Sequence, residues 1–276
     1  MRRLSCSLKI VRVRTAAITL RCWAVRICRC LGGVRHVHSV GCSRAGTCGA
    51  RAHTARGIET DEQAAQALRA FGELVPQYDG SLRYQVKAAP GFEERRYSKS
   101  VNTILVHTEA PGWNPPPTCL ALHCRVQATC GSGHTELADM RRFVAMLGEA
   151  DRAALYERDI EWVGHNTGGV GTEGVRRPVV ERVNGRETLR FSYNLLTTGQ
   201  YDPPVDASVD PAELPLGSFG IHLAEQAEAF FRENKISVLI PENSVLVWDN
   251  QRMVHARSAY RDARRHLTRY WVAAPN

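Results

Sequence analysis

The chain has 276 residues, enough for one large domain or two small ones, and a formal net charge of +8. The charge is concentrated at one end: residues 1–58 hold twelve Lys and Arg and no Asp or Glu, and the rest holds 24 basic against 28 acidic side chains. The larger part is therefore mildly acidic, which argues against a nucleic-acid-binding surface. No apolar run approaches the ~20 residues that span a bilayer, so no membrane partner is expected.

Residues 1–58 form a basic leader with the composition of an organelle transit peptide, most simply a mitochondrial one. An upstream exon or a start codon assigned in error would give the same composition, and the protein would then be expected in the cytoplasm. Both interpretations stay open. Six of the nine cysteines lie in this leader, which argues against the disulfide framework of a secreted protein. Its Cys28-x-Cys30 and His36-x-His38 pairs fit no common zinc module.

One folded domain is expected over residues 59–276. An acidic first turn predicts a short helix over Asp61–Glu73. Strands are predicted over Val101–His107 and Thr118–Arg125, with a Gly/Pro-rich loop between them. The spacing of apolar residues predicts a helix over Leu137–Arg158.

The second half is predicted to contain a hairpin, because Asn184-Gly185 separates the strand-like runs Val179–Val183 and Glu187–Phe191. An amphipathic helix is predicted over His222–Lys235. Four strands are predicted after it, namely Ser237–Ile240, Ser244–Trp248, Arg252–Ala256 and His266–Ala273. Many short strands, few helices and no regular alternation predict a β-rich α+β fold, a β-sandwich or jelly roll with flanking helices, rather than a Rossmann sheet.

The run Gly169-x-Gly171-x-x-Gly174 formally matches a dinucleotide-binding fingerprint. That fingerprint requires a helix directly after it, so that the helix N-terminus meets the pyrophosphate. The following residues 175–180 include Arg-Arg-Pro and do not predict a helix. The glycines are therefore interpreted as a loop close to a site.

His107 and Glu109 are separated by one residue, which places both side chains on one face of a strand. A neutral imidazole and a carboxylate are two of the three protein ligands of a non-haem Fe(II) site. His255 ends a strand-like run and is the candidate third ligand. The alternatives are an ordinary strand end without a metal for His107 and Glu109, and a hydrogen-bonded strand histidine for His255. For the arginines that follow His255, the alternative is a solvated face.

Taken in order, these segments resemble the taurine dioxygenase/clavaminate synthase-like family of Fe(II)- and 2-oxoglutarate-dependent oxygenases. The resemblance covers roughly residues 68–273. It rests on His107-Thr108-Glu109, the turn Gly131-Ser132-Gly133-His134-Thr135, Trp248-Asp249-Asn250 before His255, and Arg265 ten residues after it. The carboxylate is Glu rather than the commoner Asp, the turn departs from Gly-Gly-Glu-Thr, and fewer residues precede His107 than is usual in the family.

The resemblance implies a double-stranded β-helix (jelly roll) in which His107, Glu109 and His255 bind Fe(II). The cosubstrate 2-oxoglutarate would chelate the iron, and O2 would bind beside it. Thr135 and Arg265 would bind the distal carboxylate of 2-oxoglutarate, because that group needs a hydroxyl donor and a guanidinium. By the same resemblance, Arg269 would bind an acidic group of the primary substrate; the alternative is a structural salt bridge.

The implied activity is that of a dioxygenase, which hydroxylates or desaturates a small, amino-acid-like molecule and releases succinate and CO2. Residues 110–118 and 163–176 are expected to form the pocket walls. A catalytically inactive jelly-roll protein that binds a small molecule is the alternative, motivated by the short segment before His107. A cupin-like metalloenzyme without 2-oxoglutarate would leave Thr135 and Arg265 without a role. The sequence identifies neither the primary substrate nor the oligomeric state.

Overall fold

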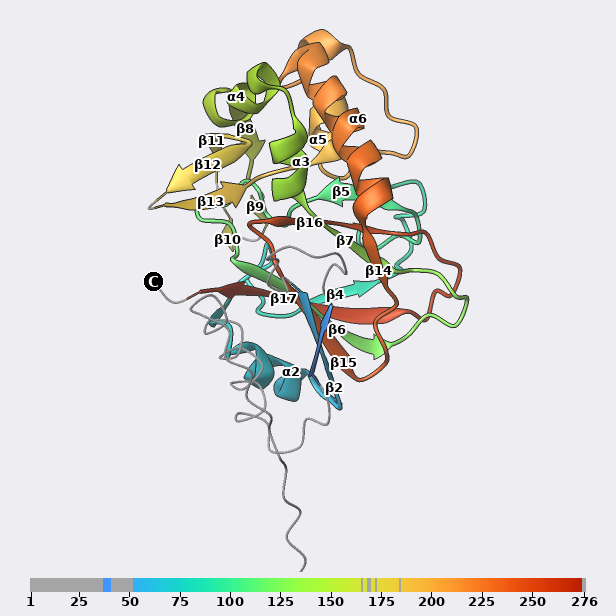
Figure 1. Cartoon of the computed structure of the whole chain (residues 1–276). Coiled ribbons are helices and arrows are strands. Elements are labelled where there is room, and N and C mark those ends of the chain that lie inside the picture. The colour runs from blue at the N-terminus through green and yellow to red at the C-terminus, as the bar shows by residue number, and fades with distance from the viewer. Residues whose placement is uncertain are drawn as a thin grey trace, which may run out of the picture.

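The computed structural model describes residues 37–40, 52–164, 166–167, 170–171, 173–183 and 185–274. Two β-sheets face each other, and helices cover their outer sides (Figure 1). Cys28 and Cys30, considered above as zinc ligands, lie outside the described residues. No helix within the described residues is long and apolar enough to cross a membrane.

The larger sheet has seven strands in the order β1-β2-β15-β6-β17-β3, and β4 also pairs with β17. Strand β2 is antiparallel to β15, so residues before the expected domain start at residue 59 contribute to this sheet. The strands are β1 Val37–Val40, β2 Ala52–Arg56, β3 Glu73–Val75, β4 Tyr84–Lys87, β6 Cys119–Val126, β15 Ser244–Asp249 and β17 His266–Ala273.

The smaller sheet has four strands in the order β14-β7-β16-β5. They are β5 Ile104–His107, β7 Thr135–Asp139, β14 Ile236–Val238 and β16 Met253–Arg257. Two facing antiparallel sheets of this kind confirm the predicted double-stranded β-helix. The predicted hairpin around Gly185 is also present, formed by β12 and β13. The short strands outside the two sheets are β8 Asp159–Val163, β9 Asn166–Thr167, β10 Val170–Gly171, β11 Gly174–Pro178, β12 Val180–Val183 and β13 Arg186–Leu189.

Strand β6 shows how the layers are held together. Leu120 and Leu122 point between the two sheets, whereas Cys119 and Ala121 pack on the opposite side against the layer that contains α2 (Asp61–Leu68). Because both faces of this sheet are covered, the strand is an almost continuous apolar run rather than an alternating one.

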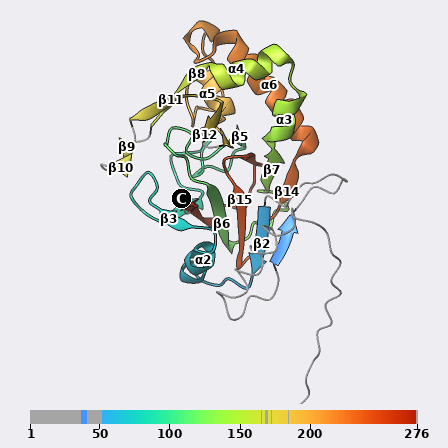
Figure 2. The ribbon, with the colours of Figure 1, turned by 60° about the vertical axis from the view of Figure 1, so that its left-hand side comes forward.

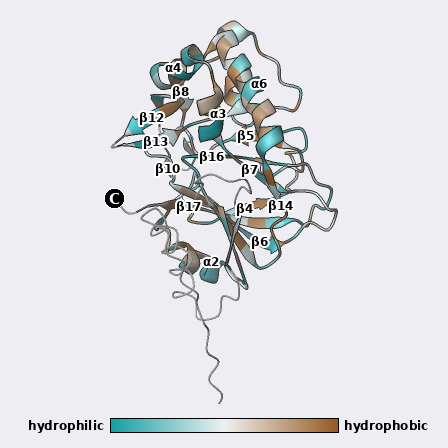
Figure 3. Ribbon diagram, viewed as in Figure 1, coloured by the Kyte–Doolittle hydropathy of each residue, from teal (hydrophilic) through white to brown (hydrophobic). Residues whose placement is uncertain are grey.

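Helices cover the outer face of the smaller sheet. Figure 2 shows α3 and α6 on the side of the molecule away from α2. Helix α6 buries Leu223, Ala227 and Phe230, which recur every three to four residues, and its mixed colouring in Figure 3 reflects this amphipathic pattern. The helices of this layer are α3 Met140–Met146, α4 Glu149–Glu157, α5 Tyr193–Thr198 and α6 Gly217–Asn234, and a 3-10 turn, η1, covers Pro211–Glu213.

The helix predicted over Leu137–Arg158 is wrong in its first part. Leu137 lies in β7 and pairs with His255 of β16, and the helical part is split into α3 and α4. Asp139 begins α3 by accepting a hydrogen bond from the Arg141 backbone N–H. Leu137 and Ala138 point to opposite sides of the sheet, a strand pattern too short to outweigh the helical spacing after it.

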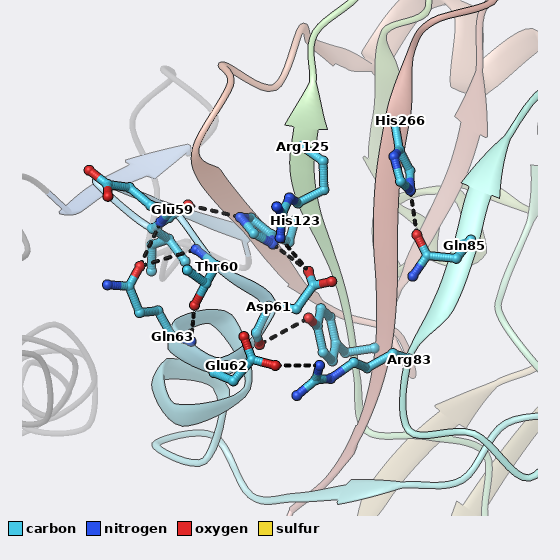
Figure 4. Close-up of polar contacts among 12 residues, drawn as sticks. Glu59, Thr60, Asp61, Glu62, Gln63, Arg83, Gln85, His123, Arg125 and His266 are labelled. Carbon is cyan, nitrogen blue, oxygen red and sulfur yellow. Dashed lines mark hydrogen bonds and ion pairs between the residues drawn. The ribbon is translucent and has the colours of Figure 1, made fainter.

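Helix α2 is fastened to the larger sheet through His123 on β6 (Figure 4). Nδ1 of His123 lies 2.9 Å from Oδ1 of Asp61, and Nε2 lies 2.8 Å from the carbonyl oxygen of Ile58. Thr60 and Gln63 form a capping box at the helix start. The helix ends at Leu68, before the predicted end, because the chain turns into β3.

Candidate metal centre and cavity

Three side chains converge between the two sheets. His107 at the end of β5 and His255 in β16 are direct partners in the antiparallel ladder, and their ring centroids lie 4.0 Å apart. Nε2 of His255 lies 3.8 Å from Oε2 of Glu109. One potential ligand atom from each of the three residues lies within 4.8 Å of the others. The structure therefore brings together the three residues selected from the sequence as iron ligands.

Glu109 is positioned differently from the expected strand arrangement, because β5 ends at His107. Its backbone N–H donates to Oδ1 of Asn250 at 2.8 Å, and its carbonyl oxygen accepts from Nδ2 of the same side chain at 3.0 Å. Asn250 is fully buried. Thr108, between the two predicted ligands, donates its N–H to the Phe191 carbonyl oxygen at 2.8 Å. These bonds replace the strand ladder in directing Glu109 toward the histidines.

The two carboxylate oxygens of Glu109 have different surroundings. Oε1 accepts a hydrogen bond from the Tyr78 hydroxyl at 2.9 Å and lies 2.7 Å from Nη1 of Arg269. Arg269 is itself held by Gln77, whose Oε1 accepts from its Nε at 2.8 Å. Oε2 faces His255. The polar partners thus fix the orientation of the carboxylate and leave Oε2 on the side of the two histidines.

Burial favours the neutral form of both histidines. Burial lowers the pKa of His107. Burial, together with the neighbouring His107 and Arg269, holds the pKa of His255 well below its ordinary value. Nδ1 of His107 lies 2.7 Å from the Leu105 carbonyl oxygen, to which it donates, so its Nε2 carries the lone pair.

A divalent iron fits this donor set. Among the described residues, Nδ1 of His255 has no hydrogen-bond partner although it is buried, so this imidazole is not explained by hydrogen bonding within the protein. Two neutral imidazoles and one carboxylate on one side of a cavity are the ligands of a non-haem Fe(II) facial triad.

Arg265 and Thr135 lie in the wall of the same cavity. Arg265 is 3% exposed and Thr135 is 2% exposed. Nε of Arg265 donates to the Gly133 carbonyl oxygen at 3.2 Å, and its buried Nη1 has no partner among the described residues. Gly133 has φ +82°, and a Cβ there would lie 3.1 Å from Arg265 Cδ, so a side chain would disturb the guanidinium. Neighbouring Arg264 is exposed and pairs with Asp262, so only Arg265 of these two arginines faces the cavity.

The cavity has a volume of about 310 Å³. Ala110 and Pro111 line it, as expected, but no described residue of the second expected wall, residues 163–176, does. Residues 163 and 174–176 pair instead in the β8–β11 hairpin. The wall is formed by residues 97–99 and 201–202, which the sequence did not indicate.

Buried Arg257 holds part of this wall in place. Its guanidinium donates to the carbonyl oxygens of Ser98 at 3.2 Å and Ser100 at 2.8 Å, and also to that of Asn102. The supporting roles of Arg257, Tyr78 and Asn250 were not predicted from the sequence. Only Asn250 had a usable signal, because it belongs to the Trp-Asp-Asn run before His255.

Comparison with protein families identifies the group to which the chain belongs. The model of the family described as taurine catabolism dioxygenase TauD, TfdA family matches residues 55–271. The match covers well over half of the chain, so the protein is a member of this family, and the resemblance recognised in the sequence is confirmed. No curated protein sequence matches the chain.

Solved structures with the same fold include asparagine oxygenase, in complex with Fe(II), (2S,3S)-3-hydroxyasparagine and succinate. It has a TM-score of 0.59 and 18% sequence identity, and the match covers 76% of this chain and 62% of that one. The non-haem iron oxygenase OrfP, in complex with Fe and α-ketoglutaric acid, has a TM-score of 0.56 at 16% identity, covering 78% of this chain and 64% of that one. The chain thus spans less than two thirds of the length of either protein.

Proposed function

We propose that this protein is an Fe(II)- and 2-oxoglutarate-dependent dioxygenase that hydroxylates or desaturates a small, amino-acid-like molecule and releases succinate and CO2. The observation that carries the proposal is the convergence of His107, Glu109 and His255 in a cavity that also contains the unpartnered Nη1 of Arg265. A cupin-like metal site without 2-oxoglutarate would give that buried guanidinium no ligand.

The proposed role of each residue follows from its position in the cavity. His107, Glu109 and His255 would hold Fe(II), which supplies the activation of O2 when 2-oxoglutarate is bound to it. Arg265 and Thr135 would bind the distal carboxylate of 2-oxoglutarate, which orients the cosubstrate toward the triad. Arg269 holds Glu109 through Nη1, and its buried Nη2, without a partner among the described residues, remains available for an acidic group of the substrate.

The size of the cavity supports a small substrate, because about 310 Å³ must accommodate the cosubstrate as well. The amino-acid-like character is supported by structures of similar fold, which contain bound 3-hydroxyasparagine or (3S)-hydroxy-L-Arg.

The test is succinate formation by the purified full-length protein with Fe(II), ascorbate and 2-oxoglutarate. Wild type is expected to form succinate, and His107→Ala to fall to background. His222→Ala serves as the matched control, because His222 is exposed on α6 and does not line the cavity. Absence of 2-oxoglutarate binding, with no change of melting temperature on adding Fe(II) and 2-oxoglutarate, would favour the inactive binding protein instead.

We also propose that the basic leader directs the protein to mitochondria. Its Arg-rich, acid-free composition supports this. A cleavable signal would have to end before Val37, because Val37–Val40 is a strand of the larger sheet and pairs with Ala52–Arg56. Fusing residues 1–36 to a fluorescent protein should give mitochondrial fluorescence in eukaryotic cells, and diffuse cytoplasmic fluorescence would contradict the proposal.

A further inference from the structure

Besides Glu109, the acids Asp79 and Asp202 line the cavity. Asp79 is exposed and its Oδ1 accepts from the Ser81 N–H at 3.0 Å, so Asp202 is the second carboxylate that is partly buried there. Asp202 belongs to the segment that follows α5, and Tyr201 beside it also lines the cavity. Neither residue is adjacent in sequence to a proposed metal or cosubstrate ligand. The proposed reaction therefore leaves this half-buried acid without a function.

The backbone around Asp202 is fixed by an isolated bridge to a distant segment. The Arg96 N–H donates to the Pro203 carbonyl oxygen at 3.1 Å, and the Val205 N–H donates to that of Glu94 at 3.0 Å. Nη1 of Arg95 donates to the carbonyl oxygen of Asp202 at 3.0 Å. These contacts secure the segment on both sides of Asp202, so its side chain is presented to the cavity from a defined position.

The Asp202 carboxylate itself makes no hydrogen bond or ion pair within the part of the chain that the structure describes. Arg95 reaches only its backbone. Arg269, whose guanidinium also lines the cavity, is engaged by Glu109 and Gln77. Lys99 also lines the cavity, and its ammonium lies over two aromatic rings. Its Nζ is 5.6 Å from the ring centroid of Tyr84 and 5.5 Å from that of Phe92.

An acid in this position is costly when no cation accompanies it. Burial, reinforced by the charge of Glu109, raises the pKa of Asp202 to about 7, against the opposing influence of Arg269 and Arg95. A cationic ligand group would relieve this cost and gain a charge-assisted hydrogen bond.

We propose that Asp202 is a specificity-determining residue that binds a positively charged nitrogen of the primary substrate, an ammonium or guanidinium group. The inference rests on the proposed function, because it places the substrate in the cavity of the triad. Asp202 touches the substrate at a group distant from the reacting carbon, so it governs which molecules bind rather than the oxidation itself.

The experiment uses the full-length protein with Fe(II), ascorbate and 2-oxoglutarate, and measures succinate formation on adding defined compounds. L-Lysine, L-arginine, L-asparagine and 4-aminobutyrate each carry a charged nitrogen. They are compared with butyrate, which lacks nitrogen, and with 4-acetamidobutyrate, whose nitrogen is uncharged. We expect stimulation by at least one of the four compounds with a charged nitrogen and none by butyrate or 4-acetamidobutyrate. Equal stimulation by the last two, or none by any of the four, overturns the inference.

Variants then test the residue. Asp202→Asn should raise the KM of the stimulating compound about 10- to 100-fold, the loss expected for a hydrogen bond to a charged group, while kcat changes much less. Asp202→Glu, which keeps the charge, should recover part of the affinity. Asp206→Asn is the matched control, since Asp206 is exposed on the same segment, and its KM should equal that of wild type.

An unchanged KM in Asp202→Asn also overturns the inference. Calorimetric binding of 2-oxoglutarate shows that each variant is folded, and it separates the two proposals. Wild-type protein that binds 2-oxoglutarate and forms succinate but shows no preference for cations refutes the role of Asp202 alone. Wild-type protein that does not bind 2-oxoglutarate refutes the oxygenase proposal.

Discussion

Two clusters in this molecule contain the same three kinds of side chain, a buried histidine, an acid and an arginine. In the outer cluster, on the side of the larger sheet covered by α2, His123 has Asp61 and Ile58 as acceptors for its two ring nitrogens, and Arg125 lies 3.5 Å from the same carboxylate (Figure 4).

In the inner cluster, between the sheets, His255 and Glu109 lie beside Arg269, but the arrangement is incomplete. Nδ1 of His255 has no partner among the described residues, and its Nε2 lies 3.8 Å from the carboxylate, too far for a good hydrogen bond. The comparison shows that residue types alone do not distinguish a structural cluster from a binding site. The difference lies in which polar atoms the protein leaves without partners.

The largest effect is expected from removing the inner histidine. His255→Ala deletes one of the three proposed metal ligands, so we expect 2-oxoglutarate turnover to fall at least about 100-fold, more than the loss of an outer hydrogen bond would cause. The free energy of unfolding of the metal-free protein should fall by about 1–3 kcal/mol, because packing against Trp248 and His107 is lost but no protein hydrogen bond of Nδ1 is. Turnover near the wild-type rate would show that His255 is structural.

The outer histidine should behave in the opposite way. His123→Ala leaves the Asp61 carboxylate and the Ile58 carbonyl oxygen without their shared donor, so we expect a loss of about 2–4 kcal/mol in the free energy of unfolding. Urea denaturation measures this loss. Turnover per folded molecule should stay within a factor of two, and a selective loss of turnover at unchanged stability would contradict the structural role.

A smaller effect is expected from one hydroxyl beside the inner cluster. Tyr78→Phe removes the hydrogen bond to Oε1 of Glu109 and keeps the ring that packs edge-on against Trp271. The affinity for Fe(II), measured by calorimetry in the absence of oxygen, should fall about tenfold. Tyr156→Phe is the matched control, because its hydroxyl donates to Glu187 outside the cavity. Equal affinities of the two variants would show that the bond to Glu109 does not position the ligand.

The smallest expected effect concerns three cysteines, whose thiol pKa values differ because their surroundings differ. Hydrogen bonds from Ser132 and from backbone groups lower the pKa of exposed Cys130 to about 6, whereas burial raises the pKa of Cys119 and Cys124 to about 12. Because the thiolate is the reactive form, iodoacetamide at pH 7 should modify Cys130 and leave the other two intact. Peptide mapping by mass spectrometry measures this, and modification of Cys119 in the folded protein would contradict the burial.

The sequence was sufficient to predict the fold class and to select the three converging side chains. The local patterns around His107, Glu109 and His255 left alternatives open, and the selection came from the order in which these residues, Thr135 and Arg265 resemble the family. The helix over Leu137–Arg158 failed at its start because pairing with β16 outweighed the local apolar spacing.

The supporting residues could not be predicted in the same way. Tyr78 is 31 positions from Glu109 in the chain, and Arg257 is 157 positions from the Ser100 carbonyl oxygen that it binds. Asp202 reaches the cavity only because its segment forms a bridge to Arg95. Such contacts arise from loop packing, for which a single sequence has no periodic signal.

The bonds of Asn250 have a consequence for how this protein can diversify. Its Nδ2 donates to the carbonyl oxygens of both Glu109 and Pro117, each at 3.0 Å, so one side chain ties together the two ends of the loop over residues 110–116. The loop is thereby a closed unit whose base is anchored independently of its tip. Ala110 and Pro111 of this loop line the cavity, so substitutions there can reshape the pocket for new molecules while the proposed iron ligand Glu109 keeps its place. Substrate choice can therefore change while the proposed chemistry is retained.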